Sequence, residues 1–252
     1  MSIRRSCGIS DIGSVRSRNE DAFCVADDIG FYVVADGVGG SPGGDVASRI
    51  AVDVAEAFLR KAFAGMPHMP GLFREDTSAL NRLMCSAVQG ANTAVYHQSI
   101  RVPALSGMCT TFAAALFVGD SLAIVHVGDS RIYRLRDGVL DQLTEDHTLA
   151  QEQFRRGLLS RSELLKCDYR NIISRVIGIE PNVESVFAEY AVQESDRYLL
   201  CTDGLSNMLG HDVIHEILST EGLPESVCLS LVSGALQSGG FDNITVVAVY
   251  CR

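Results

Sequence analysis

Acidic residues recur in one context along this sequence: they lie at the end of an apolar run that has the pattern of a strand, or directly before one. Asp36, Asp129 and Asp203 follow such runs and are themselves followed by glycine or serine, whereas Asp242 and the pair Glu20-Asp21 precede one. Taken singly, each is also ordinary turn chemistry, because Asp-Gly is a common turn sequence. Taken together, they would converge if these strand ends share one edge of the fold.

Converging carboxylates repel one another and take up protons unless cations lie between them. An oxygen-only ligand set without Cys or His suits Mg²⁺ or Mn²⁺ better than zinc. The sequence therefore predicts a site for two divalent ions, in which Gly37 lets a backbone carbonyl approach a metal. Such ions hold a water between them and lower its pKa, so that hydroxide can attack phosphorus near neutral pH. Arg16, five residues before Asp21, is the candidate for binding phosphate oxygens, since a guanidinium matches phosphate in two hydrogen bonds.

The elements that must position these residues can be read from the apolar pattern. Eight segments have the pattern of strands: Ala22–Ala26, Phe31–Ala35, Thr110–Val118, Leu122–His126, Ile132–Arg136, Phe187–Val192, Tyr198–Cys201 and Ile244–Tyr250. Four have helical spacing: about 45–64, with Asp45 as a candidate cap, about 77–98, 212–219 and 224–237. Continuous apolar runs indicate strands buried on both faces, so we expect two packed sheets covered by helices.

Residues of about 145–182 differ from the rest because they are polar and helical, with Ser160 to Glu163 fitting a capping box. Strands are predicted on both sides of this segment. It is therefore expected to be an insertion at the rim of the sheets.

Composition narrows the class of protein. The chain has 252 residues, of which 47% are hydrophobic and 21% charged, which favours a folded core over bulk disorder. No apolar run reaches the roughly 20 residues of a membrane helix, and no secretory signal follows the first arginines. A net charge of −10 argues against nucleic acid and anionic membranes as partners. The closest two of the eight cysteines, Cys7 and Cys24, are too far apart for a CxxC zinc pattern, and a reducing cytoplasm is expected.

The motifs, in their order along the chain, resemble those of the metal-dependent protein phosphatases, the type 2C serine/threonine phosphatase family, and its compact bacterial branch in particular. The segments that carry the resemblance are Ser10–Asp21, Ala35–Gly40, Cys109–Thr111, Val127–Arg131, Leu143–His147, Cys201–Leu205 and Gly240–Thr245.

The resemblance implies an α+β fold, a four-layer α-β-β-α sandwich with two mainly antiparallel sheets. It implies one catalytic domain over residues 1–252, with the insertion at about 145–182 as its flap. The resemblance also implies the roles of individual residues. The direct ligands of two Mn²⁺ or Mg²⁺ ions are expected to be Asp36, Asp203, Asp242 and the Gly37 carbonyl, with Glu20 and Asp21 binding through metal-bound water or supporting those ligands. Asp129 is expected to hold a third, weaker ion with Asp203, and Arg16 to bind phosphate. Val38 replaces a histidine that many eukaryotic relatives have, so the general acid is not identified.

The function expected from these observations is metal-dependent hydrolysis of phosphoserine and phosphothreonine in proteins by a metal-bridging hydroxide. The partners implied are phosphorylated proteins, namely a bacterial eukaryotic-like Ser/Thr kinase and its substrates. The protein itself is expected to be a monomer in the cytoplasm. Two alternatives stay open: a dedicated regulator of one switch or secretion-system protein, and an inactive relative that binds phosphoproteins. Cys109 and Cys201 lack the CX5R loop of cysteine phosphatases, and the pair His211 and His215 is expected to lie on a helix surface.

Overall fold

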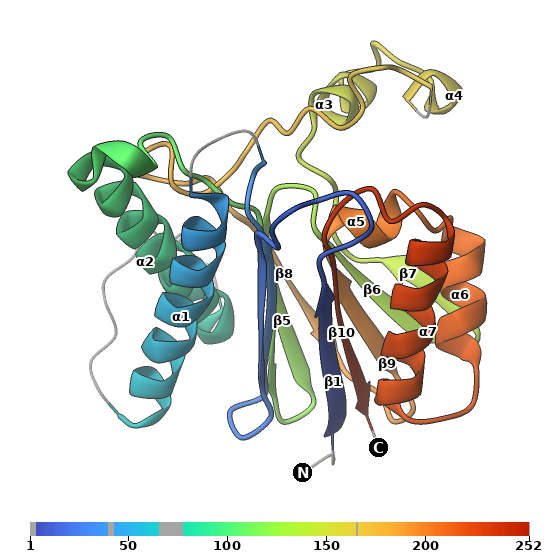
Figure 1. Ribbon diagram of the computed structural model, residues 1–252. Helices are drawn as coiled ribbons and strands as arrows, with labels where there is room; N and C mark the ends of the chain where they lie inside the picture. The colour runs from blue at the N-terminus through green and yellow to red at the C-terminus, as the bar shows by residue number, and fades with distance from the viewer. Residues whose placement is uncertain (1–3, 40–42, 66–77, 165, 252) are drawn as a thin grey trace.

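The computed structural model describes residues 4–39, 43–65, 78–164 and 166–251, and within them two five-stranded antiparallel sheets (Figure 1). Sheet one contains, in spatial order, β1 (Arg4–Asp11), β10 (Ile244–Cys251), β9 (Arg197–Cys201), β6 (Arg131–Arg136) and β7 (Val139–Gln142). Sheet two contains β2 (Asp21–Ala26), β3 (Phe31–Asp36), β4 (Phe112–Val118), β5 (Ser121–Val127) and β8 (Val186–Ala191).

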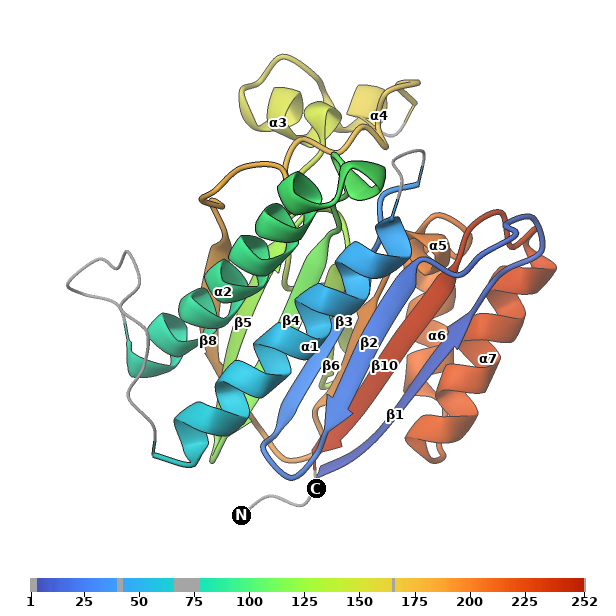
Figure 2. The same ribbon diagram turned by 60° about the vertical axis from the view of Figure 1, so that its left-hand side comes forward.

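Helices cover the outer face of each sheet, as Figures 1 and 2 show. The long helices are α1 (Gly44–Phe63) and α2 (Ala79–Arg101) over sheet two, and α6 (His211–Ser219) and α7 (Pro224–Gln237) over sheet one. The short ones are α3 (Leu149–Arg155), α4 (Arg161–Leu164), α5 (Asp203–Ser206) and the 3-10 turn Pro103–Leu105. The four-layer sandwich is therefore confirmed.

Strand β4 shows why continuous apolar runs form this architecture. Phe112 and Leu116 pack into the layer under α1 and α2, whereas Ala113 and Phe117 pack into the layer between the sheets. Alternate residues of a strand point to opposite faces, so a strand in the middle of four layers needs apolar residues at every position. Full burial of each large apolar side chain contributes roughly 1.5–3 kcal/mol.

The eight strands predicted from the sequence are confirmed within two residues at each end, but two strands were missed. Strand β1 has half-buried residues and lies at the edge of sheet one, and β7 has only four residues. Neither has a long apolar run. The missed β7 is joined to β6 by Asp137 and Gly138, both at positive φ as a tight hairpin turn requires.

The predicted helices are also confirmed, with one local correction. Asp45 does not cap α1: it lies in the first turn, and Gly43, at φ 84°, occupies the cap position. A left-handed backbone there favours glycine and excludes the extended conformation of a normal Asp cap. Helix α2 is capped by Ser78, whose hydroxyl accepts from the Asn81 N–H; its predicted start at Thr77 lies outside the described residues.

The segment between β7 and β8 stands above the strand ends and carries α3 and α4 (Figure 1). Its two ends meet: the Leu149 N–H donates to the Ile172 carbonyl and the Ser174 N–H donates to the His147 carbonyl, both at 2.8 Å. The capping box at Ser160 and Glu163 is present, with reciprocal bonds of 2.7 and 3.3 Å. We call residues 145–182 the flap segment. Among the helices of the described residues, none is long and apolar enough to cross a bilayer.

Candidate metal centre and catalytic cleft

The strand ends that carry the predicted acidic residues lie at the edge of the sandwich that faces the flap segment (Figure 1). Asp21 begins β2 and Asp36 ends β3, and the two are direct partners in the antiparallel register. In the other sheet, Asp203 begins α5 after Thr202, the residue that follows β9, and Asp242 lies two positions before the first residue of β10. Asp129 follows β5. Both sheets therefore contribute carboxylates to this edge.

These carboxylates are close enough to disfavour one another's charge. Burial, and then the charges of Asp21, Asp203 and Asp129, raise the pKa of Asp36, whose carboxyl also shares a hydrogen bond with Asp203. Burial, followed by the charges of Asp203 and Asp242, raises the pKa of Asp21 to about 7, although hydrogen bonds from the Thr245 and Thr202 hydroxyls act to lower it. Burial and the Asp203 charge raise the pKa of Asp129 to about 8. In the folded protein these groups need protons or cations.

The acids have free oxygens that fit cations. Asp21, Asp129 and Asp203 each have a buried Oδ1 atom with no hydrogen-bond partner. A buried carboxylate oxygen without a donor is costly, and a hard divalent ion satisfies it. As the side chains of the described residues stand, no three His, Cys, Asp or Glu form a closed group that could hold a metal. A cation between Asp36 and Asp203 would relieve the repulsion that helps to raise the pKa of Asp36.

Gly37 lies where a side chain cannot be placed. A Cβ atom at this position would lie 2.3 Å from the Gly44 carbonyl oxygen and 2.6 Å from the Glu20 carbonyl oxygen. The Gly37 N–H donates to the same Glu20 carbonyl at 3.1 Å. This contact fixes the backbone of Gly37 beside Asp36. Glu20 itself is half-buried, and burial and the charge of Asp45 raise its pKa.

Arg16 comes from the loop between β1 and β2 and donates to Asp242 Oδ2 at 2.7 Å. Its side chain is 43% exposed, so the guanidinium is accessible to a ligand. The two loops that carry this pair are tied together: the Ser14 N–H donates to the Gly240 carbonyl at 2.7 Å, and Asn243 donates to the carbonyls of Ile12 and Arg18. The position of Arg16 relative to Asp242 is therefore set by the backbone.

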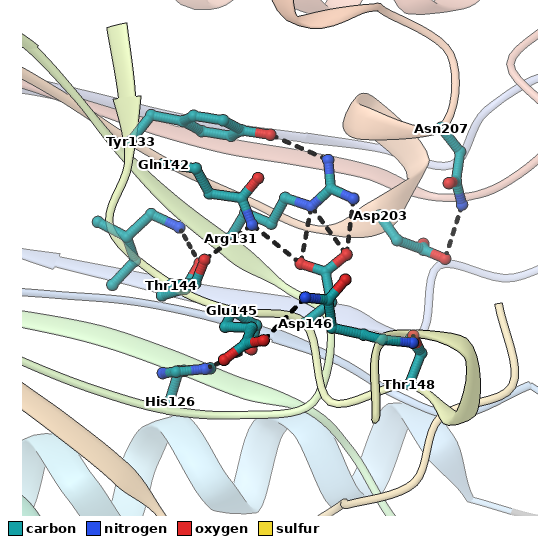
Figure 3. Close-up of polar contacts among 12 residues, drawn as sticks. His126, Arg131, Tyr133, Gln142, Thr144, Glu145, Asp146, Thr148, Asp203 and Asn207 are labelled. Carbon is teal, nitrogen blue, oxygen red and sulfur yellow. Dashed lines mark hydrogen bonds and ion pairs between the residues drawn. The ribbon is translucent and has the colours of Figure 1, made fainter. Parts of the chain in front are cut away.

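A cleft of about 900 Å³ is lined by Asp129 and Asp203 of this edge and by Arg161 and Arg170 of the flap segment. Arg131 and Asp146 also line this cleft, and Figure 3 shows their ion pair, in which Arg131 donates to both oxygens of Asp146 at 2.6–3.1 Å.

The same view shows Asn207, whose amide donates to Asp203 Oδ2 at 3.0 Å and leaves Oδ1 free (Figure 3). Sequence reasoning assigned no role to Asn207, Arg131 or Asp146. Arg131 and Asp146 lie within the recognised motifs Val127–Arg131 and Leu143–His147. Their place in these motifs is the sequence feature that could have indicated a role at the site.

The histidine pair on α6 has a structural explanation. The His211 and His215 rings make hydrogen bonds to the carbonyls of Leu140 and Gly138, at 3.1 and 2.8 Å. They hold α6 on the β6–β7 hairpin, and these contacts give no indication of a metal pair.

Comparison with known proteins supports the motifs. The family model described as Protein phosphatase 2C matches residues 13–221. The serine/threonine phosphatase Stp of Listeria monocytogenes is 34% identical over 243 residues, which cover 95% of this chain and 93% of that protein. The serine/threonine protein phosphatase PstP of Mycobacterium tuberculosis is 37% identical over 246 residues, which are 97% of this chain but only 44% of PstP.

Solved structures agree in fold over almost the whole chain. The catalytic domain of PstP in complex with two manganese ions has a TM-score of 0.82 and 33% identity, covering 100% of this chain and 99% of that one. PppA, a regulatory component of the type VI secretion system in Pseudomonas aeruginosa, has a TM-score of 0.82 and 30% identity, covering 99% and 98%.

Proposed function

The chain belongs to the protein phosphatase 2C family and is a metal-dependent serine/threonine protein phosphatase. From this membership we propose which of its residues perform the reaction and which kind of kinase the phosphatase opposes. The observation that carries the proposal is the set of unpartnered, buried Oδ1 atoms of Asp21, Asp129 and Asp203 at one edge of the two sheets. Such atoms fit Mn²⁺ or Mg²⁺, which are the ions of this family.

We assign the direct ligands of two ions to Asp36, Asp203, Asp242 and the Gly37 carbonyl, with Glu20 and Asp21 supporting them. Asp129 and Asp203 hold a third, weaker ion. When bound, the ions supply positive charge at the phosphate and a water of lowered pKa. Arg16 binds the non-bridging phosphate oxygens through its exposed guanidinium, which Asp242 orients.

The chain's own nucleophiles do not compete with this route. Burial raises the pKa of the Cys109 thiol to about 11 and that of Cys201 to about 12, so neither supplies a thiolate near neutral pH. Val38 carries no proton for the leaving hydroxyl. The un-ionised thiols support hydrolysis without a phosphocysteine intermediate, and the side chain at position 38 does not act as the general acid.

The biological counterpart that we propose is a Ser/Thr kinase of the bacterial eukaryotic-like type, together with its substrates, in signal transduction in the cytoplasm. The names of the relatives Stp and PstP support the reaction, and eight unpaired cysteines support a reducing compartment. We further propose that the chain acts as a monomer and a single catalytic domain, with the flap segment beside the cleft. The likeness to PppA favours a second candidate, a phosphatase dedicated to one secretion-system protein.

A phosphothreonine peptide tests the reaction directly. With Mn²⁺ we expect turnover that EDTA abolishes and added Mn²⁺ restores. Asp36→Asn and Asp203→Asn should each lower kcat by orders of magnitude, whereas Asp53→Asn, an exposed change on α1, should not. Near-wild-type rates in both site variants would refute the ligand assignment, and no turnover by the wild type would support an inactive, phosphoprotein-binding relative.

A further inference from the structure

The two sheets are joined at the metal edge by hydrogen bonds to one buried carboxylate. Asp21 belongs to β2 in sheet two and is 6% exposed. Its Oδ2 atom accepts from the Thr202 hydroxyl at 2.9 Å and from the Thr245 hydroxyl at 2.6 Å. Thr202 follows β9 and Thr245 lies in β10, so both donors belong to sheet one, and both are fully buried. One oxygen atom thus receives two donors from the opposite sheet.

The direction of each bond in this cluster is fixed by the groups around it. The Thr202 hydroxyl accepts from the Thr245 N–H at 3.0 Å, so its own hydrogen is left for Asp21. Asn19 donates to Ser10, whose hydroxyl lies 2.7 Å from that of Thr245. Because the Asn19 amide oxygen accepts from the Asp21 N–H, the amide cannot be reversed without losing that bond. Donation therefore runs from Asn19 through Ser10 and Thr245 to Asp21.

Asp21, Thr202 and Thr245 lie close in sequence or in strand register to acids of the proposed metal site. Asp21 is the register partner of Asp36 in sheet two. Thr202 directly precedes Asp203, and Thr245 is three residues after Asp242. The bonds from the two hydroxyls to Asp21 therefore link the acids of sheet one directly to those of sheet two. Two further hydrogen bonds join the sheets near this edge, from the Glu20 N–H to Asn243 Oδ1 at 2.8 Å and between the Thr111 and Ser130 hydroxyls at 2.7 Å, but neither involves a carboxylate of the site.

We infer that Thr202 and Thr245, with Ser10 and Asn19 behind them, are positioning residues that hold Asp21 across the two sheets and so set the spacing of the divalent-ion site. Oδ2 of Asp21 is bound by the hydroxyls, which leaves the unpartnered Oδ1 on the other side of the same carboxylate. Metal ligands tolerate deviations of only about 0.2 Å, and residues that orient ligands typically change metal affinity by about 10–100-fold when removed. This inference rests on the metal site proposed above.

The test uses variants that remove a hydroxyl and keep the shape of the side chain. Thr202→Val and Thr245→Val remove one donor each, and Thr202→Ser and Thr245→Ser keep it. Thr93→Val is the matched control, because the Thr93 hydroxyl bonds only to the Gln89 carbonyl of its own helix α2. Two quantities are measured on the full chain: the Kd of Mn²⁺ by titration calorimetry without substrate, and kcat and KM for a phosphothreonine peptide at several Mn²⁺ concentrations.

We expect each valine variant to raise the Kd of Mn²⁺ by about 10-fold or more, with KM for the peptide at saturating Mn²⁺ little changed. The serine variants should return the Kd close to that of the wild type, and Thr93→Val should leave it unchanged. If valine at either position prevents folding, Ser10→Ala serves instead: it lies outside the fully buried cluster and should raise the Kd by a smaller factor, because Thr245 loses the donor that directs its hydrogen.

Two results separate the possible failures. Folded valine variants that bind Mn²⁺ as tightly as the wild type would overturn the positioning role, even if their thermal stability falls. A Ser10→Ala variant with the wild-type Kd would do the same where the valine variants cannot be made. A wild-type protein that binds no Mn²⁺ in the calorimeter would instead contradict the metal site itself.

Discussion

Acidification should destabilise the root of the flap segment through His147. This residue is 7% exposed and stacks on His126 with ring centroids 4.6 Å apart. Its Nδ1 accepts from the Gly128 N–H at 3.1 Å, which requires the neutral ring. Burial, followed by the charges of His126, Arg175 and Arg155, lowers the pKa of His147 from 6.5 to about 3. The folded protein therefore keeps this ring neutral well below pH 6.

The sign and size of the effect follow from the two pKa values. Below pH 6.5 the unfolded chain binds a proton at this histidine and the folded chain does not, so the free energy of unfolding falls as pH falls. With a folded pKa near 3, the loss relative to neutral pH is about 0.8 kcal/mol at pH 6 and about 2 kcal/mol at pH 5. The loss ends near pH 3, where the folded protein also binds the proton.

Urea unfolding followed by circular dichroism at pH 7.5, 6 and 5 measures this loss, and the chain has no tryptophan to report by fluorescence. His147→Asn provides the comparison, since its Oδ1 can accept from Gly128 but cannot titrate. The carboxylates of the metal edge titrate in both proteins, so the difference between them isolates the histidine. His97→Asn, an exposed change on α2, is the control and should behave as the wild type. Equal losses in His147→Asn and the wild type would refute the reasoning.

Two further changes test the site itself. Arg16→Ala removes the proposed phosphate ligand and should raise KM by about 10–100-fold, the effect of losing a charge-assisted hydrogen bond. Arg16→Lys should give a KM between those of the wild type and Arg16→Ala. Steady-state kinetics that show a fall in kcat alone would contradict this role. Gly204→Ala should lower the free energy of unfolding in urea by roughly 1–3 kcal/mol, because its Cβ would lie 1.9 Å from the Asn243 carbonyl oxygen. Gly90→Ala within α2, where the nearest atom to the new Cβ would be Val54 Cγ1 at 3.9 Å, is the control and should lose no stability. Equal losses in the two variants would argue against a tight fit between α5 and Asn243, the residue before β10.

Much of the sandwich could be predicted because its strands are buried on both faces. A continuous apolar run such as Phe112–Val118 is accommodated best as a strand that is buried on both faces. β1 lacked that signal: its sequence, RRSCGISD, is polar and half-buried at a sheet edge, so only its pairing with β10 identifies it. The N-cap of α1 was wrongly predicted at Asp45 for another reason. The left-handed backbone of Gly43 places the cap at that residue, and the sequence alone does not reveal the φ of Gly43.

The candidate site shows a different limit. Acids at strand ends could be picked out because each has a local context, Asp-Gly after an apolar run. Thr202 and Thr245 lie within the recognised motifs Cys201–Leu205 and Gly240–Thr245. No local pattern indicates their role, because their common partner Asp21 lies 181 and 224 residues away in sequence. Buried threonines are common strand residues, and their hydroxyls become informative only when the two sheets are placed face to face.

The closed root of the flap segment has an evolutionary consequence. Because the Leu149 N–H reaches the Ile172 carbonyl and the Ser174 N–H reaches the His147 carbonyl, the chain leaves the sandwich and returns to it at almost the same point. The entropy of closing such a loop grows only slowly with its length. Residues 150–171 can therefore be lengthened, shortened or exchanged between homologues while the strands beneath keep their register, so this segment can diversify faster than the catalytic framework that carries it.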